Sequence, residues 1–212
     1  MPTVVEQAIT LKGSSDMVSQ FFSYAINAVL YMRGVYPAEM FEQRKAYDVN
    51  LMVATDQRLN AYLSQVLEQV KIWLSSGMVE SLVLVLTDVA KAKQIEKWTF
   101  NIEMGEDAVK SRKKSKKSIK QAQKEIQALM RQIVSSVTFL PLISSPCSFD
   151  LLIYCDKDAA TPEHWEESGP CDIVGEKIQL AEYSTGYHRV TGSICYTTDD
   201  DDEEEEEESE SL

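Results

Sequence analysis

Residues 138–170 of this chain read TFLPLISSPCSFDLLIYCDKDAATPEHWEESGP. The central run alternates between two sets of residues, Phe149, Leu151 and Ile153 on one face and Asp150, Leu152 and Tyr154 on the other. This alternation predicts a strand over residues 147–155, with one face in a core and the other partly apolar. A polar, turn-rich segment and about forty weakly patterned residues follow it. Because this weakly patterned stretch directly follows a regular strand, we expect that it can pack in more than one place on the domain.

The length and charge of the chain limit what it can be. It has 212 residues, of which 44% are apolar, which is enough for one domain with a sizeable core. Its net charge of -13 comes mostly from residues 199–212, which carry eleven acidic groups, and the remaining body is close to neutral. A nearly neutral body lacks the net positive charge that is typical of nucleic-acid-binding proteins. We expect residues 199–212 to be a disordered acidic tail, because its charges repel and it has little to bury.

Several classes of protein are excluded by what the sequence lacks. No apolar run reaches the length of a membrane span, and Met1–Leu11 lacks the pattern of a signal peptide, so we expect a soluble intracellular protein with no membrane partner. The cysteines and histidines show no metal-binding spacing, so we expect no metal and no cofactor. They are Cys147, Cys155, Cys171, Cys195, His164 and His188. No strand end offers a nucleophile next to a base, so the sequence does not predict an enzyme.

The periodicity of apolar residues predicts three amphipathic helices and a sheet. The expected elements are, in chain order, a short strand over 8–11, a helix that begins at Ser14 or Ser15 and ends at Gly34, a strand over 47–53, a helix over 59–74 closed by Gly77, a hairpin of strands 81–86 and 96–102, and a helix over 119–133. Trp73 is interpreted as a core residue. The sequence therefore predicts an α+β domain, with the helices packed on a mixed or antiparallel sheet over residues 1–198.

Residues 110–120 hold seven Lys or Arg side chains, a composition typical of nucleic-acid binding or nuclear import. The run contains no aromatic residue on which a base could stack, and it joins a predicted strand to a predicted helix. We therefore interpret it as a solvated linker.

Four runs, over residues 10–41, 137–142 (VTFLPL), 147–158 (CSFDLLIYCDKD) and 165–170 (WEESGP), closely resemble the spindle-checkpoint members of the HORMA-domain family. The resemblance spans about residues 8–196. The polymerase-accessory HORMA proteins share an element matching Tyr31, Arg33, Val35, Tyr36 and Pro37, but they are unlike this chain in the CSFDLLIY and WEESGP runs. The match is loose over residues 171–196, and the acidic tail lies outside the family pattern.

The resemblance implies a conformational switch that clasps a peptide without catalysis. In the family, the segment matching residues 159–196 is a safety belt that wraps a linear peptide paired to the edge of the 147–155 strand. The peptide-binding residues carried over are Phe149, Leu151, Leu152, Ile153, Tyr154 and Trp165. The belt covers that edge in the open state. In the closed state it lies beside the strand that carries Trp98, in place of an N-terminal strand. Strand-like runs over 177–183 and 187–196, joined by a turn at 184–186, predict a mobile belt hairpin.

The partners implied by the resemblance are the checkpoint scaffold mitotic-arrest-deficient-one and the activator of the anaphase-promoting complex, whose inhibition delays anaphase. Open and closed copies would pair through Arg131, Gln132 and Phe139, although a polar helix face alone would be interpreted as solvated. An AAA+ remodelling ATPase with its adaptor, and a location in nucleus, kinetochore and cytoplasm, are also implied. The alternatives are a HORMA adaptor of a meiotic axis or of a translesion DNA polymerase complex, and a histone-binding protein that uses its acidic tail.

Overall fold

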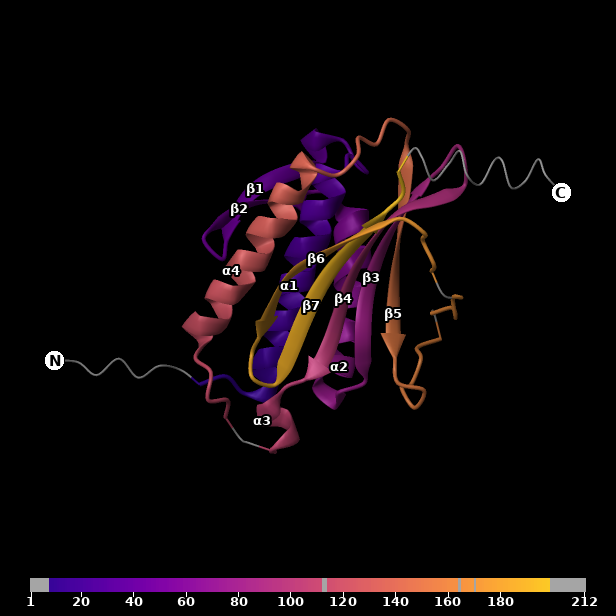
Figure 1. Cartoon of the computed structure of the whole chain (residues 1–212). Coiled ribbons are helices and arrows are strands. Elements are labelled where there is room, and N and C mark those ends of the chain that lie inside the picture. The colour runs from indigo at the N-terminus through magenta and orange to yellow at the C-terminus, as the bar shows by residue number, and fades with distance from the viewer. Residues whose placement is uncertain (1–7, 112–113, 164, 170, 199–212) are drawn as a thin grey trace.

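The computed structural model describes residues 8–111, 114–163, 165–169 and 171–198 (Figure 1). Its elements are, in chain order, α1 (Leu11–Met32), the 3-10 helix η1 (Ala38–Met40), β1 (Phe41–Ala46), β2 (Val49–Ala54), α2 (Gln57–Ser76), β3 (Val79–Asp88), β4 (Lys93–Met104), α3 (Glu106–Val109), α4 (Ile119–Ser135), the 3-10 helix η2 (Ser136–Thr138), β5 (Cys147–Cys155), β6 (Glu176–Ser184) and β7 (His188–Tyr196). Three long helices and an antiparallel sheet confirm the predicted α+β class.

The main sheet has five strands in the order β5-β3-β4-β7-β6, and every neighbouring pair is antiparallel. In the register of the sheet, Leu84 of β3 lies opposite both Trp98 of β4 and Leu151 of β5. The residues of β3 from Leu82 to Leu86 are buried on both faces, as their continuous apolar run predicts. The predicted β3–β4 hairpin is confirmed, and β5 and β6 form the two ends of the sheet.

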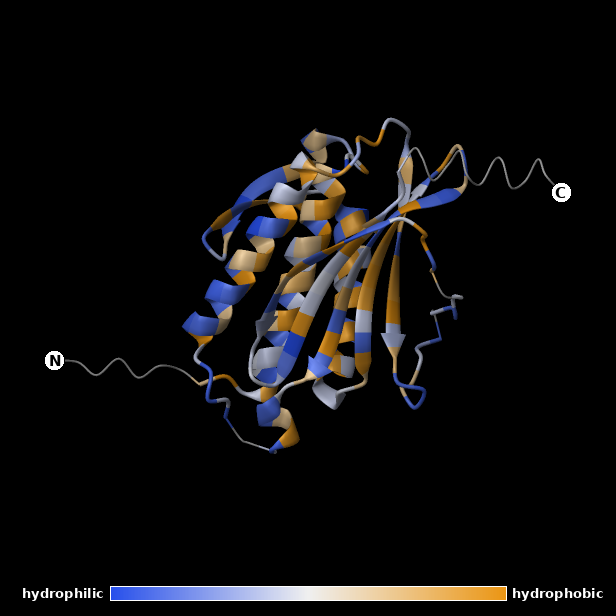
Figure 2. Cartoon of the chain, in the orientation of Figure 1, coloured by the Kyte–Doolittle hydropathy of each residue, from blue (hydrophilic) through white to orange (hydrophobic). Residues whose placement is uncertain are grey.

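Helices α1 and α2 cover one face of the sheet, and α4 lies along α1 and β6 (Figure 1). Figure 2 shows the apolar residues of α1 and of the central strands gathered in the middle of the molecule. Phe21 and Phe22 of α1 are fully buried, and each ring packs against Phe100 of β4, with centroids 5.5 and 5.9 Å away. Helix α1 is thus the central core helix that its spacing of apolar residues predicts.

The N-terminal end of α1 differs from the prediction. The N-cap is Thr10, whose hydroxyl accepts a hydrogen bond from the backbone N–H of Gly13 at 3.1 Å. The predicted caps, Ser14 and Ser15, are instead buried within the helix. The predicted strand over 8–11 is also wrong, because Leu11 is already helical and only Ala8 forms an isolated bridge.

A two-stranded hairpin, β1–β2, lies outside the main sheet and packs beside α1. Its turn consists of Tyr47 and Asp48, whose φ angles of 50° and 56° are in the left-handed region. The second strand therefore begins at Val49, not at Tyr47 as predicted. The sequence does not predict strand β1, because residues 42–45 are exposed polar residues without any apolar alternation.

Capping residues explain where α2 and α4 begin and end. Asp56 accepts from the N–H of Leu59 at the start of α2, and Gly77, with φ 71°, ends that helix as predicted. Ser118 and Gln121 form a capping box at the start of α4. No helix in the described part of the chain is long and apolar enough to cross a membrane.

Candidate peptide-binding site

Strand β5 ends the sheet, and among the described strands it pairs only with β3. Its outer edge therefore presents backbone N–H and C=O groups that another strand could pair with. Its side chains point to two faces. Phe149 packs toward the helical face against Tyr36 and Tyr62, with ring centroids 6.1 and 6.0 Å away. Leu152 and Tyr154 pack on the opposite face against Val83 and Val85.

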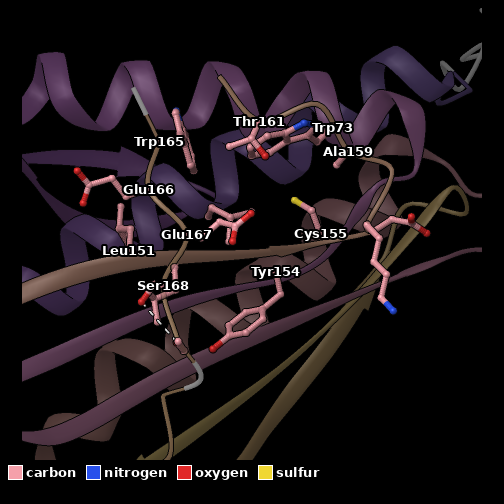
Figure 3. Close-up of a pocket in the computed structure, with 15 residues that line it drawn as sticks. Trp73, Leu151, Tyr154, Cys155, Ala159, Thr161, Trp165, Glu166, Glu167 and Ser168 are labelled. Carbon is pink, nitrogen blue, oxygen red and sulfur yellow. Dashed lines mark hydrogen bonds between the residues drawn. The ribbon is translucent and has the colours of Figure 1, made fainter. Parts of the chain in front are cut away.

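Residues 156–163, 165–169 and 171, which we call the strap, follow β5 in the sequence and lie beside its edge (Figure 3). A pocket of about 370 Å³ lies between the strap and the strand. Its lining includes Leu151–Cys155 of β5, Trp73 of α2, and Trp165–Gly169 of the strap. The carboxylates of Glu166 and Glu167 belong to this lining. The pocket thus combines a strand edge that no other described strand covers, two indole rings and negative charge.

One end of the strap is held by α2. The indole rings of Trp73 and Trp165 lie edge to face, with centroids 5.1 Å apart at an interplanar angle of 79°. The indole N–H of Trp73 also donates to the carbonyl oxygen of Ala160 at 3.2 Å. These contacts fix the strap over the C-terminal half of β5.

The other end of the strap crosses the open face of the sheet. Cys171 is buried against Val83 and Val85, and its carbonyl oxygen accepts from the Nζ of Lys97 at 2.6 Å. Its N–H donates to the hydroxyl of Tyr154 at 3.4 Å. Burial raises the pKa of the Cys171 thiol, so the thiol stays neutral. The strap is therefore anchored on both sides of the pocket.

Beyond the strap, β6 and β7 form the predicted belt hairpin, which lies beside β4. Ile194 of β7 lies opposite Trp98, and Tyr183, Val190 and Ile194 are all buried in the main core. This placement matches the one that the resemblance gives for the closed state. Because these residues fill the core, the hairpin contributes to the stability of the domain in this state.

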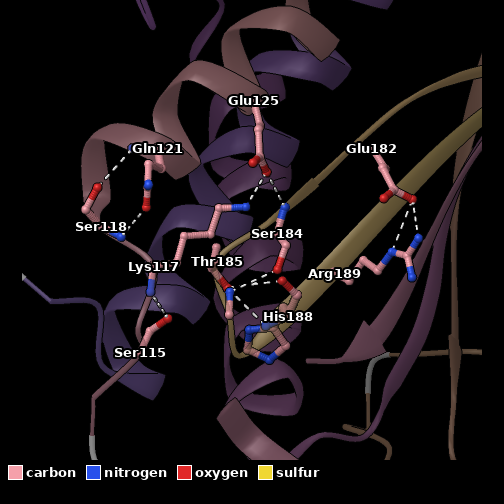
Figure 4. Close-up of polar contacts among 11 residues, drawn as sticks. Ser115, Lys117, Ser118, Gln121, Glu125, Glu182, Ser184, Thr185, His188 and Arg189 are labelled. Atoms are coloured by element: carbon pink, nitrogen blue, oxygen red, sulfur yellow. Dashed lines mark hydrogen bonds and ion pairs between the residues drawn. The ribbon is translucent and has the colours of Figure 1, made fainter. Parts of the chain in front are cut away.

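A buried polar cluster holds the turn of the belt hairpin, and Figure 4 shows two of its members, Thr185 and His188. One ring nitrogen of His188, Nε2, lies 3.0 Å from the carbonyl oxygen of Leu74, and the other, Nδ1, lies 2.6 Å from the hydroxyl of Ser14. A carbonyl can only accept, so Nε2 carries the proton and Ser14 donates to Nδ1. The Ser14 hydroxyl is also 2.5 Å from that of Thr185. Burial lowers the pKa of His188, which favours this neutral form.

The structure brings together five of the six residues predicted to bind the peptide. Leu151, Leu152, Ile153, Tyr154 and Trp165 line the pocket. The sixth, Phe149, lies outside the pocket lining, in the N-terminal half of β5.

Sequence reasoning missed the second role of Trp73. The side chain is only 6% exposed, which agrees with its interpretation as core, but it also lines the pocket and anchors the strap. Helical periodicity carries no signal for a contact with Trp165, because that residue is distant in the sequence.

The predicted self-association residues lie at the C-terminal end of α4 and just beyond it. Arg131 is exposed, and Phe139 is 49% exposed. The side-chain oxygen of Gln132 accepts from the N–H of Ala181 at 2.5 Å, so this residue contacts the belt strand β6. A surface that includes Gln132 is therefore coupled to the position of the belt.

No group of three or more His, Cys, Asp or Glu residues that could hold a metal occurs among the described residues. Of the two histidines considered as ligands, His188 is in the polar cluster and His164 lies outside the described residues.

Comparisons with known proteins agree with this geometry. The family model of the HORMA domain matches residues 14–189. The mitotic spindle assembly checkpoint protein MAD2A of Homo sapiens is 45% identical over 192 residues, covering 90% of this chain and 94% of the relative. MAD2A of Mus musculus is 44% identical over 91% of this chain and 95% of the relative.

Among solved structures, a chain in the crystal structure of a mitotic checkpoint complex superposes with a TM-score of 0.80 at 36% identity, covering 88% of this chain and 99% of that one. A C. elegans HTP-2 structure bound to a HIM-3 closure motif is 14% identical with a TM-score of 0.70, which shows the shared fold alone. The chain belongs to the HORMA-domain family, and within it to the MAD2 branch of spindle assembly checkpoint proteins.

Proposed function

We propose that this chain is a non-catalytic spindle assembly checkpoint protein that holds a linear peptide of its partners between β5 and the strap. The observation that carries the proposal is the outer edge of β5, which has no partner among the described strands and faces a strap anchored on both sides of a pocket. An extended peptide would add to β5 as a sixth strand, with backbone hydrogen bonds supplying affinity. The strap would pass over it, so that release requires the strap to open.

The lining of the pocket indicates what the peptide contains. Leu151 and Ile153 and the two indole rings favour apolar side chains. Glu166 and Glu167 favour a cationic residue beside them. The partners proposed are the checkpoint scaffold mitotic-arrest-deficient-one and the activator of the anaphase-promoting complex, which would compete for one site at kinetochores, in the nucleus and in the cytoplasm.

The belt is proposed to have a second, open placement in which it covers the edge of β5. The two placements exclude each other, so peptide binding shifts the population toward the placement described above. Pairing of open and closed copies through Arg131, Gln132 and Phe139, and remodelling by an AAA+ ATPase with its adaptor, complete the proposal. The exposed Arg131 and Phe139 and the contact of Gln132 with the belt support such a coupling.

Proline substitutions on β5 test the site. N–H groups of β5 point alternately toward β3 and away from it, so Leu152→Pro and Ile153→Pro form a matched pair. In one of the two variants, proline removes an N–H that bonds to β3. In the other, it removes an N–H that points away from β3 and could donate only to the peptide. The variant that stays folded should lose capture of scaffold and activator peptides. Full affinity in that variant would exclude the β5 edge.

Pull-downs from cell extracts, with the unmodified chain and the folded proline variant as bait, distinguish the checkpoint function from the HORMA adaptor function. Capture of scaffold and activator, lost in the folded proline variant, is the expected result. Capture of meiotic-axis or polymerase proteins instead would favour the adaptor function.

A further inference from the structure

The segment between β4 and α4 holds the turn of the belt hairpin through its backbone. The N–H of Gly105 donates to the carbonyl oxygen of Tyr187 at 2.7 Å, and the N–H of Asp107 donates to that of Gly186 at 3.0 Å. The turn is thus held by residues that precede it by about eighty positions in the sequence. A change that moves this segment would remove two of the backbone hydrogen bonds that hold the turn.

Ser115 lies at the centre of this contact. It is 6% exposed, and its hydroxyl donates to the carboxylate of Asp107 at 2.6 Å and accepts from the N–H of Lys117 at 2.9 Å. A Cβ placed on Gly186 would overlap both the Ser115 hydroxyl and the Asp107 carboxylate. The two side chains therefore pack directly on the backbone of the belt turn. No room is left there for a group larger than a hydroxyl.

A second link runs through Glu125 of α4, shown in Figure 4 between Lys117 and Ser184. Its Oε2 accepts from the Nζ of Lys117 at 2.5 Å and from the N–H of Ser184 at 2.9 Å. Lys117 is two residues beyond Ser115. A new anion at Ser115 would compete with Glu125 for this lysine and weaken the hold on Ser184.

The sequence around Ser115 is strongly basic. Residues 110–117 read KSRKKSKK and carry six Lys or Arg side chains, and three of them directly precede Ser115. A protein kinase with an acidic substrate groove binds serines in such surroundings, because the charges are complementary. The proposed checkpoint function does not account for this run.

We propose that Ser115 is a phosphorylation site for a protein kinase that selects basic sequences, and that its phosphate expels the belt turn from its place beside the 105–118 segment. In the reaction the Ser115 Oγ forms a bond to the γ-phosphorus of ATP, the bond to the β–γ bridging oxygen breaks, ADP leaves and the hydroxyl proton passes to the base of the kinase. The product carries about two negative charges next to Asp107. Repulsion and lack of space both oppose the docked turn.

The burial of Ser115 adds a conformational requirement. The kinase can reach the hydroxyl only when the segment has separated from the belt turn, so phosphorylation would trap the released state. A held peptide stabilises the docked belt and should slow the reaction at Ser115. This regulation rests on the proposed function, because release of the belt matters only if the belt holds a peptide.

The test uses the full-length protein with phosphoserine incorporated at position 115. Phosphoserine at position 111 is the matched control, because Ser111 is exposed and belongs to the same basic run. Amide hydrogen exchange is measured on β7 and on α1. We expect exchange of β7 to accelerate about tenfold or more with phosphoserine 115 and to stay unchanged with phosphoserine 111, while α1 stays protected in both.

Gly186→Ala perturbs the same turn without adding charge, because its methyl group would overlap the Ser115 hydroxyl and its φ of 89° is strained for a residue with a side chain. Equal protection of β7 in the proteins with phosphoserine 115 and 111 would overturn the proposal, whether or not a peptide binds. If the unmodified protein does not bind the peptide, the proposed function is overturned instead. The exchange of β7 would still show whether phosphate at Ser115 releases the belt turn.

A kinase assay tests whether Ser115 is phosphorylated and whether a bound peptide slows the reaction. A kinase that selects basic sequences should phosphorylate Ser115 in the free protein and more slowly in the peptide-bound protein, with Ser111 unaffected by the peptide. Modification of Ser111 without any modification of Ser115 would also overturn the proposal.

Discussion

Replacement of Trp165 by Ala should loosen the strap while the core stays folded. Trp165 is half-buried, so its removal exposes on the order of 100 Å² of apolar surface, which corresponds to about 2.5 kcal/mol. The edge-to-face contact with Trp73 adds about 1 kcal/mol. The free energy of opening the strap should therefore fall by about 3.5 kcal/mol. If a bound peptide leaves only through the open strap, its dissociation rate should rise by up to about 300-fold.

The assay is a chase of a fluorescent scaffold peptide with unlabelled peptide, followed by anisotropy. Val174→Ala is the matched control, because Val174 also lies in the belt but is 78% exposed. Its dissociation rate should equal that of the unmodified protein. The helical circular dichroism of both variants should also be unchanged. An unchanged dissociation rate in folded Trp165→Ala would refute the role of the strap as a latch.

Three further predictions concern other parts of the molecule. Arg131→Glu should block self-association, seen by light scattering, without loss of peptide binding, and should change the free energy of unfolding by less than about 0.5 kcal/mol; a dimer that persists would remove Arg131 from the interface. Burial lowers the pKa of His188 below 6.5, so the unfolded state binds the proton more tightly than the folded state does. The free energy of unfolding should therefore be highest above pH 6.5. It should decrease as the pH falls below that value, by up to about 1.4 kcal/mol per pH unit. Urea titrations should show this slope, and a slope that persists in His188→Gln would assign it to another group. Deletion of residues 199–212 should leave the melting temperature unchanged in calorimetry, and a fall of more than about 3 °C would mean that the tail packs on the domain.

The sequence predicts those parts of the fold where periodicity and capping agree. The spacing of apolar residues in α1 and the continuous apolar run of β3 predict both elements, because each is buried almost completely. The alternation in β5 and the turn before β7 were equally informative. Strand β1 was missed because its exposed residues are polar and only pairing with β2 makes it a strand.

The site depends more on tertiary contacts. The residues of β5 that line the pocket follow from local alternation, whereas Trp73 joins them through tertiary contacts with Ala160 and Trp165. The position of the belt beside β4, and the fit of Ser115 against Gly186, bring together segments far apart in the sequence. Local patterns carry no information on such packing, and the position of the belt was expected only from the resemblance to a known family.

Hydrogen exchange of the β5 amides with and without a bound scaffold peptide tests the central claim most directly. Amides of β5 that point toward β3 are already hydrogen-bonded, whereas those on the outer edge are available to a ligand. We predict that peptide binding protects alternate amides between Cys147 and Cys155 and protects the strap as well. Tight binding that leaves the outer amides of β5 unprotected, with new protection on another surface, would contradict the proposed clasp.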